Sequence, residues 1–192
     1  MFNPSLSPDL KSLTVSINEP DPQLLVKIFN QLFEKSENTL LKMGAKEPFY
    51  RAAKEGKPAV IFAREDYFSS ALHEIAHWTI AGLERRKLDD FGYWYEPEGR
   101  SEKQQKEFES VEVKPQAIEW LLSMACNHPF HFSADNLSRS LDASEEFTTS
   151  VKLQAAEYLN NSSMPDRASL LFKKLKQQYR NGRQVELLAE AC

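Results

Sequence analysis

The chain has 192 residues, of which 41% are hydrophobic and 27% charged, and its formal net charge is −4. This composition is typical of an ordinary globular domain with a hydrophobic core and excludes a disordered chain. The negative charge disfavours nucleic acid or anionic lipid as a partner, and no apolar stretch approaches the ~18 residues of a membrane span.

The N-terminal segment shows no sign of targeting. Residues 1–20 contain three prolines and are predicted to form an extended N-terminal arm, without the pattern of an export or transit signal. Cys126 and Cys192 are the only cysteines, and two widely spaced thiols fit a reducing compartment. We therefore expect a cytoplasmic protein with a single domain over residues 21–192.

The first predicted elements are a helix and a strand. Asp21 and Pro22 are typical of the cap and first turn of a helix. The apolar residues that follow recur at helical spacing and would face a core: Leu24, Leu25, Ile28, Phe29, Leu32 and Phe33. A turn at residues 54–58 then leads into a short apolar run at residues 59–63, which we predict to be a strand.

The rest of the chain is mainly helical by pattern. A second helix is predicted over about residues 67–87, with Asp66 as its N-cap. Further helices are predicted at about residues 102–126, 144–160 and 166–180. Pro115 lies inside the first of these, so a break or a kink is expected there. The fold class is thus α+β, a mainly helical single domain with a small sheet.

The second predicted helix carries a motif typical of metal-binding sites. His73 and His77 lie four residues apart, and this spacing places both imidazoles on one helical face, where they can bind one metal ion. Glu74 follows the first histidine, as in the HExxH motif of metalloproteases, in which this glutamate is the base. The motif uses two of the four histidines in the chain. We therefore expect a metalloprotease-like metal-binding helix.

The next predicted helix offers two candidates for a third metal ligand. Glu109 and Glu112 lie one turn apart, and either carboxylate would complete a set of two histidines and one carboxylate with open positions. Glu112 is preferred, because the neighbouring Val111, Val113 and Pro115 indicate burial. His128 and His131 are interpreted as structural histidines, and Trp78 as a core residue. The aromatic loop at residues 91–95 is compatible with either packing or recognition.

This ligand set permits two chemistries. Zinc would give a peptidase in which Glu74 activates the bound water, whereas iron(II) would leave positions for dioxygen and give an oxygenase. No histidine has a carboxylate two residues later, which argues against the common 2-oxoglutarate oxygenases. The motif alone favours a zinc hydrolase.

Several sequence blocks, taken together, favour the iron enzyme over the zinc hydrolase. The sequences HEIAHW at residues 73–78, DFGYWY at 90–95 and VEVKPQA at 111–117, with the later Pro129-Phe130 and Asp135-Asn136-Leu137, resemble the elongation factor P hydroxylase family. The resemblance covers about residues 67–137. It implies an iron-dependent enzyme that hydroxylates a lysine of translation elongation factor P after a β-lysyl group has been attached.

The resemblance also implies roles for particular residues. His73, His77 and Glu112 would bind iron(II), with zinc as a possible substitute and dioxygen as cosubstrate. Glu74 would be a catalytic-site residue that handles protons, orients the groups around the ligands, or does both. The alternatives are a zinc metallopeptidase and a non-enzymatic, metal-stabilised helical protein that binds a translation factor.

The substrate's extra amine calls for acidic side chains around the site. The chain offers Asp89, Asp90, Glu96, Glu98, Glu109 and Asp135 near the motifs. Of the residues in these segments, we take Tyr95, Glu109 and Asp135 as candidate substrate-binding residues.

Overall fold

The computed structural model describes residues 20–90, 101–133 and 143–183. The first element is helix α1 (Pro22–Phe33), and the side chain of its N-cap, Asp21, accepts a hydrogen bond from the backbone N–H of Gln23 at 2.9 Å. The apolar face predicted for this helix packs into the core, and Leu25 and Phe29 are fully buried. The predicted start and buried face of this helix are confirmed.

A three-stranded sheet follows, in the order β1-β3-β2. Strand β1 (Thr39–Ala45) runs parallel to β3 (Ala59–Arg64), and β2 (Phe49–Arg51) runs antiparallel to it. The predicted strand at residues 59–63 is β3, the central strand, and its apolar composition is explained by neighbours on both sides. Sequence patterns did not identify the other two strands.

An amide side chain fastens α1 to the outer strand of this sheet. The Oδ1 atom of Asn30 accepts a hydrogen bond from the backbone N–H of Leu41 at 2.7 Å, and its Nδ2 donates to the carbonyl of Leu41 at 3.3 Å. Leu41 is paired in register with Ile61 of β3, and both side chains belong to the hydrophobic core. The helix and the sheet are therefore joined by polar contacts as well as by apolar ones.

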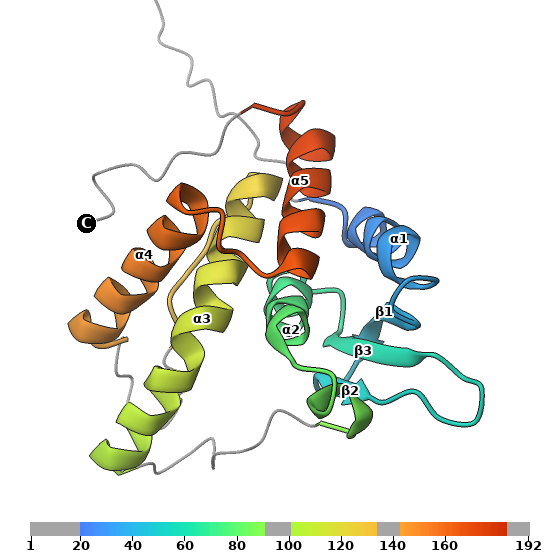
Figure 1. The fold of residues 1–192 in the computed structure, drawn as a ribbon, viewed down its shortest axis with the longest axis horizontal. Coiled ribbons are helices and arrows are strands. Elements are labelled where there is room, and N and C mark those ends of the chain that lie inside the picture. Colours follow the sequence, from blue (N-terminus) through green and yellow to red (C-terminus); the bar gives the residue numbers. More distant parts are fainter. Residues whose placement is uncertain (1–19, 91–100, 134–142, 184–192) are drawn as a thin grey trace, which may run out of the picture.

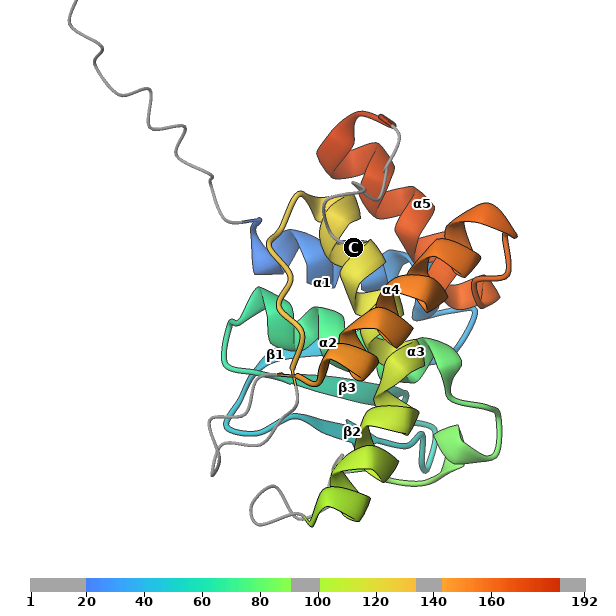
Figure 2. The same ribbon diagram turned by 90° about the vertical axis from the view of Figure 1, so that its left-hand side faces the viewer.

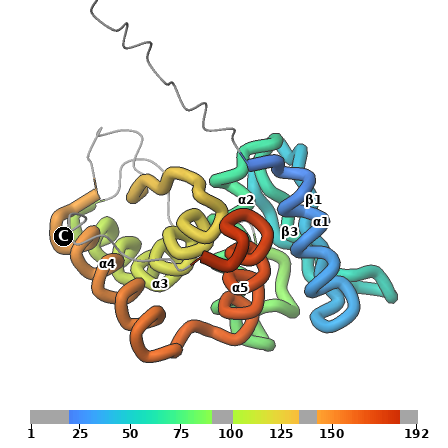
Figure 3. Tube along the Cα trace, turned by 90° about the horizontal axis from the view of Figure 1, so that it is seen from above, coloured from blue at the N-terminus to red at the C-terminus, as the bar shows by residue number. Residues whose placement is uncertain are grey.

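The remaining helices build a layer beside the sheet (Figure 1). Helix α2 (Phe68–Ile80) lies between the strands and helix α3 (Glu102–Cys126), against which α4 (Glu145–Asn160) and α5 (Asp166–Arg180) pack. Figure 2 shows α1 and α2 over one face of the sheet. Figure 3 shows α5 between α1 on one side and α3 with α4 on the other. No helix in the described ranges is long and apolar enough to cross a membrane.

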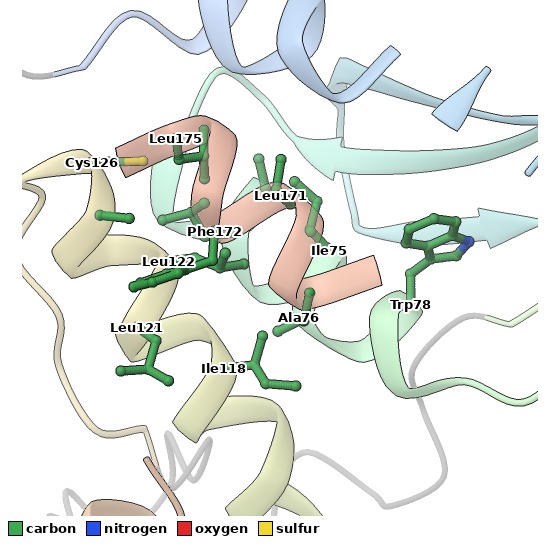
Figure 4. Packing of buried hydrophobic residues seen from close by; sticks show 14 of the residues in the cluster. Ile75, Ala76, Trp78, Ile118, Leu121, Leu122, Cys126, Leu171, Phe172 and Leu175 are labelled. Carbon is green, nitrogen blue, oxygen red and sulfur yellow. The ribbon is translucent and has the colours of Figure 1, made fainter. Parts of the chain in front are cut away.

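One part of the core lies where α2, α3 and α5 meet (Figure 4). Ile75 and Ala76 of α2 face Ile118 and Leu122 of α3, and all four side chains are completely buried. Leu171 of α5 lies over the same junction. This packing fixes α2 and α3 relative to each other, and these two helices carry the site described below.

Helix α2 is shorter than the sequence predicts. It ends at Ile80 rather than near residue 87, and a separate 3₁₀ turn occupies Arg85–Lys87. Asp66 is not its N-cap, because the helix begins one residue later with Tyr67 as the cap and no capping side chain. The helical pattern beyond Ile80 was misleading, and Leu83 is exposed.

The C-terminal end of α2 is hydrogen-bonded to a residue that lies far away in the sequence. The guanidinium of Arg167, on α5, donates hydrogen bonds to the carbonyls of Trp78, Thr79 and Ala81 at 3.2, 3.0 and 2.6 Å. The same guanidinium lies 4.9 Å from the centroid of the Trp78 ring. A cation at a helix C-terminus is favourable because the last carbonyls have no partner within the helix.

Two further charged residues complete this arrangement. Arg86 donates to the carboxylate of Glu37 at 2.7 Å, and Arg167 approaches the same carboxylate at 3.8 Å. We call Glu37, Arg86 and Arg167 the guanidinium cluster. It joins the segment before β1, the 3₁₀ turn and α5 to the end of α2.

Helix α3 matches its predicted range and continues unbroken through Pro115. Of the two outcomes expected there, a break is therefore excluded. Proline removes the N–H that would bond to the carbonyl four residues earlier, and that residue, Val111, is 53% exposed, so solvent can satisfy its carbonyl. The ranges predicted for the last two helices agree with α4 and α5.

Candidate metal centre

Helix α2 presents two histidines beside its buried face. Leu72, Ile75 and Ala76 face the core, which turns His73 and His77 toward α3 with partial exposure. The two rings lie with their centroids 4.7 Å apart, and their Nε2 atoms are separated by 3.1 Å. The predicted helical spacing therefore brings two imidazole nitrogens to one point.

The carboxylate of Glu112 reaches the same point from α3. Its Oε1 lies 3.3 Å from Nε2 of His77, and the residue is only 6% exposed. The three side chains offer ligand atoms that all lie within 4.8 Å of one another. Glu112 is buried as predicted, but the neighbour used to argue for it, Val111, is exposed, because adjacent residues on a helix point in different directions.

This donor set fits a metal ion. When an ion binds two ligand atoms at about 2.1 Å with an angle between about 90° and the tetrahedral value, those atoms lie about 3.0–3.4 Å apart. Two of the three separations in this cluster, 3.1 and 3.3 Å, fall within that range. The other carboxylate oxygen of Glu112 is buried and has no hydrogen-bond partner among the described residues. A buried carboxylate oxygen without a partner is costly, and a cation would offset that cost. We call His73, His77 and Glu112 the metal-centre cluster.

A second glutamate on α3 contacts the other side of the first histidine. Oε2 of Glu119 lies 2.8 Å from Nδ1 of His73, and Glu119 is 9% exposed. Sequence reasoning missed this residue. The available signal was its position seven residues after Glu112, which places both carboxylates on one face of the same helix.

The carboxylates give the centre an excess of negative charge. Burial lowers the pKa of His73, but the charge and hydrogen bond of Glu119, together with two further glutamates, outweigh it and raise this pKa to about 10. Burial raises the pKa of Glu74, although both histidines act in the opposite direction. Burial likewise opposes ionisation of Glu112, but contact with His77 holds the pKa of that carboxyl below its usual value. Such surroundings favour a bound cation.

The carboxylate of Glu109 is already engaged elsewhere. It accepts hydrogen bonds from Gln105 at 3.2 Å and from the hydroxyl of Ser144, the N-cap of α4, at 2.8 Å. Glu109 therefore links α3 to the start of α4, one turn away from Glu112. Tyr95 and Asp135, the other candidate substrate-binding residues, lie outside the described residues.

Two of the acids expected to surround the site are also paired. Asp89 accepts from the backbone N–H of Ala52 at 2.9 Å and from Lys54 at 2.8 Å. Asp90 accepts from Arg85 through both Nε and Nη2. Both acids therefore have roles in the fold, and Glu96 and Glu98 lie outside the described residues.

The other singled-out side chains lie outside the metal-centre cluster. Nε2 of His128 lies 2.8 Å from the hydroxyl of Ser69, its ring packs against Phe68, and His131 is exposed. Trp78 is a core residue as predicted, since it is 4% exposed and packs edge-on against two phenylalanines of α1. The aromatic loop at residues 91–95 is not described.

The fold and the site together define a class: an α+β protein, mainly helical, whose paired histidines and buried glutamate are suited to a metal ion. The family model described as elongation factor P hydroxylase matches residues 28–188. A relative from Haemophilus influenzae, named elongation factor P lysine hydroxylase, is 50% identical over 153 residues, which make up 79% of this chain and 85% of that protein. The chain belongs to the elongation factor P hydroxylase family.

Proposed function

We propose that this protein hydroxylates a lysine side chain of elongation factor P to which a β-lysyl group has been attached. The proposal combines membership of the hydroxylase family with one observation in the structure, the convergence of His73, His77 and Glu112. A modification of a translation factor would take place in the cytoplasm, in accord with the cysteine usage of the chain.

Iron(II) is the metal that best suits this reaction. Two histidines and one carboxylate on one face of the ion leave positions open, as in non-haem iron oxygenases. When bound, iron(II) would supply the oxidation chemistry, with dioxygen as cosubstrate. Zinc would occupy the same ligands without redox chemistry, and nothing in the family assignment supports the metallopeptidase alternative.

The protein's own residues have distinct parts in this proposal. Nε2 of His73, Nε2 of His77 and a carboxylate oxygen of Glu112 would hold the ion. Glu74 follows the first ligand in the chain, and burial raises the pKa of its carboxyl, so it is suited to hold and pass a proton beside the metal. The metalloprotease-like HExxH helix is in this view a scaffold for oxidation rather than for hydrolysis.

The substrate's terminal amine would need an acidic partner as it leaves water. Tyr95, Glu109 and Asp135 are the proposed substrate-binding residues, and Glu109 would act while retaining its contact with Ser144. Reversal of charge by Glu109→Lys and by Asp135→Lys, each followed by a hydroxylation assay, tests this part. Normal activity in both variants would remove the two acids from the proposal.

The function is tested by intact-mass analysis of β-lysylated elongation factor P that has been co-expressed with this protein. We expect a gain of one oxygen on the modified lysine with the wild type and none with His73→Ala. His131→Ala is the matched control, because His131 is exposed and lies outside the metal-centre cluster, and it should behave as wild type. No gain of oxygen with folded, iron-loaded wild type would refute the proposed function.

A further inference from the structure

Glu119 is a buried acid that the proposed ligand set does not use. Glu119 is 9% exposed, and its Oε2 lies 2.8 Å from Nδ1 of His73. The metal-facing atom of that ring is Nε2, which lies 3.1 Å from Nε2 of His77. Because the two nitrogens are on opposite sides of the ring, Glu119 contacts the side of His73 that points away from the metal-centre cluster.

The chemistry of this contact selects one form of the imidazole. An ionised carboxylate can only accept hydrogen bonds, so Nδ1 must carry the hydrogen that it donates to Glu119. In a neutral imidazole this leaves the lone pair on Nε2, which is the form able to bind a metal there. The contact also fixes the rotation of the ring, because turning it over would separate Nδ1 from the carboxylate.

Helix α3 holds this carboxylate rigidly. Glu119 follows Ile118 and precedes Leu121, both completely buried in the core between α2, α3 and α5 (Figure 4). Glu112 lies two turns earlier on the same face of this helix, so one rigid element carries both a ligand and the residue that orients another ligand. Among the described residues, His77 has no comparable partner on its Nδ1.

We propose that Glu119 is a positioning residue that accepts the Nδ1 hydrogen of His73 and thereby holds Nε2 of that ring ready for the metal. This inference rests on the proposed metal centre. Carboxylates that orient ligating histidines typically change metal affinity about 10- to 100-fold when they are removed. Glu119 therefore acts through His73 and need not touch substrate.

Equilibrium titration with Co²⁺, monitored by its absorption spectrum, tests the role without any turnover. In Glu119→Met, which fills the space but accepts no hydrogen bond, Co²⁺ should bind about 10- to 100-fold more weakly. In Glu119→Gln, whose amide oxygen can still accept from Nδ1, the loss should be less than about tenfold. Glu107→Met is the matched control, because Glu107 lies on the same helix with an exposed side chain, and it should bind Co²⁺ as the wild type does.

Two outcomes would overturn the role. Co²⁺ affinity in folded Glu119→Met equal to that of the wild type, with only the unfolding temperature lowered, would make Glu119 a purely structural residue. In ¹⁵N-histidine spectra of the zinc-loaded wild type, we expect His73 to be protonated on Nδ1 and metal-bound through Nε2. Metal-bound or bare Nδ1 would overturn the inference even if the variants failed to fold.

The metal titrations distinguish a wrong role for Glu119 from a wrong metal centre, on which the proposed function depends. A wild-type protein that binds neither Co²⁺ nor Zn²⁺ would refute the metal centre and, with it, the role of Glu119. A wild-type protein that binds metal as tightly as Glu119→Met would refute the role of Glu119 alone.

Discussion

Helix α2 contacts two clusters of charged side chains, which differ in how their acceptor atoms are satisfied. In the guanidinium cluster, Arg167 donates to three backbone carbonyls at the end of the helix, and Arg86 pairs with Glu37 at 2.7 Å. In the metal-centre cluster, two ring nitrogens face each other at 3.1 Å, and a buried carboxylate oxygen of Glu112 has no partner among the described residues.

The difference separates a polar cluster that serves folding from one that serves binding. At the guanidinium cluster the last carbonyls of α2 accept hydrogen bonds from Arg167, so the protein itself satisfies the end of the helix, although Nε of Arg86 and Nε of Arg167 are buried without a partner among the described residues. At the metal-centre cluster, two ring nitrogens converge beside a carboxylate whose second oxygen is buried without a donor in the described part of the chain, and a cation would complete this set. Loss of the first cluster should therefore lower stability, and loss of the second should lower metal binding.

The largest effect is expected from Glu112→Ala. Removal of a direct ligand should weaken metal binding more than the roughly 100-fold that loss of an orienting residue can cause, and hydroxylation should fall to background. Glu109→Ala should keep most of its metal, because Glu109 bonds to Ser144 instead. Metal analysis of both purified variants checks this, and the reverse pattern would overturn the ligand assignment.

Arg167→Met should leave metal affinity intact and lower the stability of the fold. Loss of the hydrogen bonds to the end of α2 and of the contact with Trp78 should lower the free energy of unfolding by about 3 kcal/mol. For a chain of this size, that corresponds to a fall in Tm of about 6–12 °C in scanning calorimetry. Lys173→Met, an exposed change on the same helix, should leave Tm unchanged, and an equal fall in both variants would contradict the role of Arg167.

Metal addition should stabilise the folded protein through the metal-centre cluster alone. Co²⁺ at about 100 times its dissociation constant adds about 2.7 kcal/mol to the free energy of unfolding, which raises Tm by about 5–10 °C. The same shift is expected for Arg167→Met, measured at the same degree of saturation. Glu112→Ala should show no shift at the wild type's Co²⁺ concentration, and a shift equal to that of the wild type would place the ion elsewhere.

The smallest effect is expected from Glu37→Gln. Its carboxylate is partly exposed and pairs with Arg86 at 2.7 Å, so loss of the charge should lower the free energy of unfolding by about 1 kcal/mol. Urea denaturation at low salt measures this change. Glu34→Gln, on a neighbouring exposed residue, serves as the control, and a loss of metal affinity in Glu37→Gln would show that the two clusters are not independent.

Helices were predictable where their signals are local. Asp21 with Pro22 marks the start of α1, and the long patterns of α3 and α5 gave their ranges. The end of α2 was predicted wrongly, because the partner of its last carbonyls, Arg167, lies almost ninety residues later in the sequence. Strands β1 and β2 were missed because neither is a continuous apolar run like β3: in β1 only Thr39 and Leu41 are fully buried, and the three residues of β2 are half-buried.

The site was predictable to the extent that helical spacing determines it. The four-residue interval between His73 and His77 predicted that their rings would converge. That Glu112 lies near them, and Glu109 does not, follows from the angle at which α3 crosses α2, which packing of the core decides. Glu119 was missed for the same reason, since a glutamate two turns along a charged helix has no special signal until the partner helix is placed.

The contact between Asn30 and Leu41 also bears on how separate molecules of this protein behave. Strand β1 lies at the edge of the sheet, and an exposed strand edge can recruit a strand from a second molecule and begin aggregation. The amide of Asn30 occupies both the N–H and the carbonyl of Leu41, near the middle of that edge. A single uncharged side chain thus blocks intermolecular strand addition at the point where an incoming chain would otherwise find its first pair of hydrogen bonds.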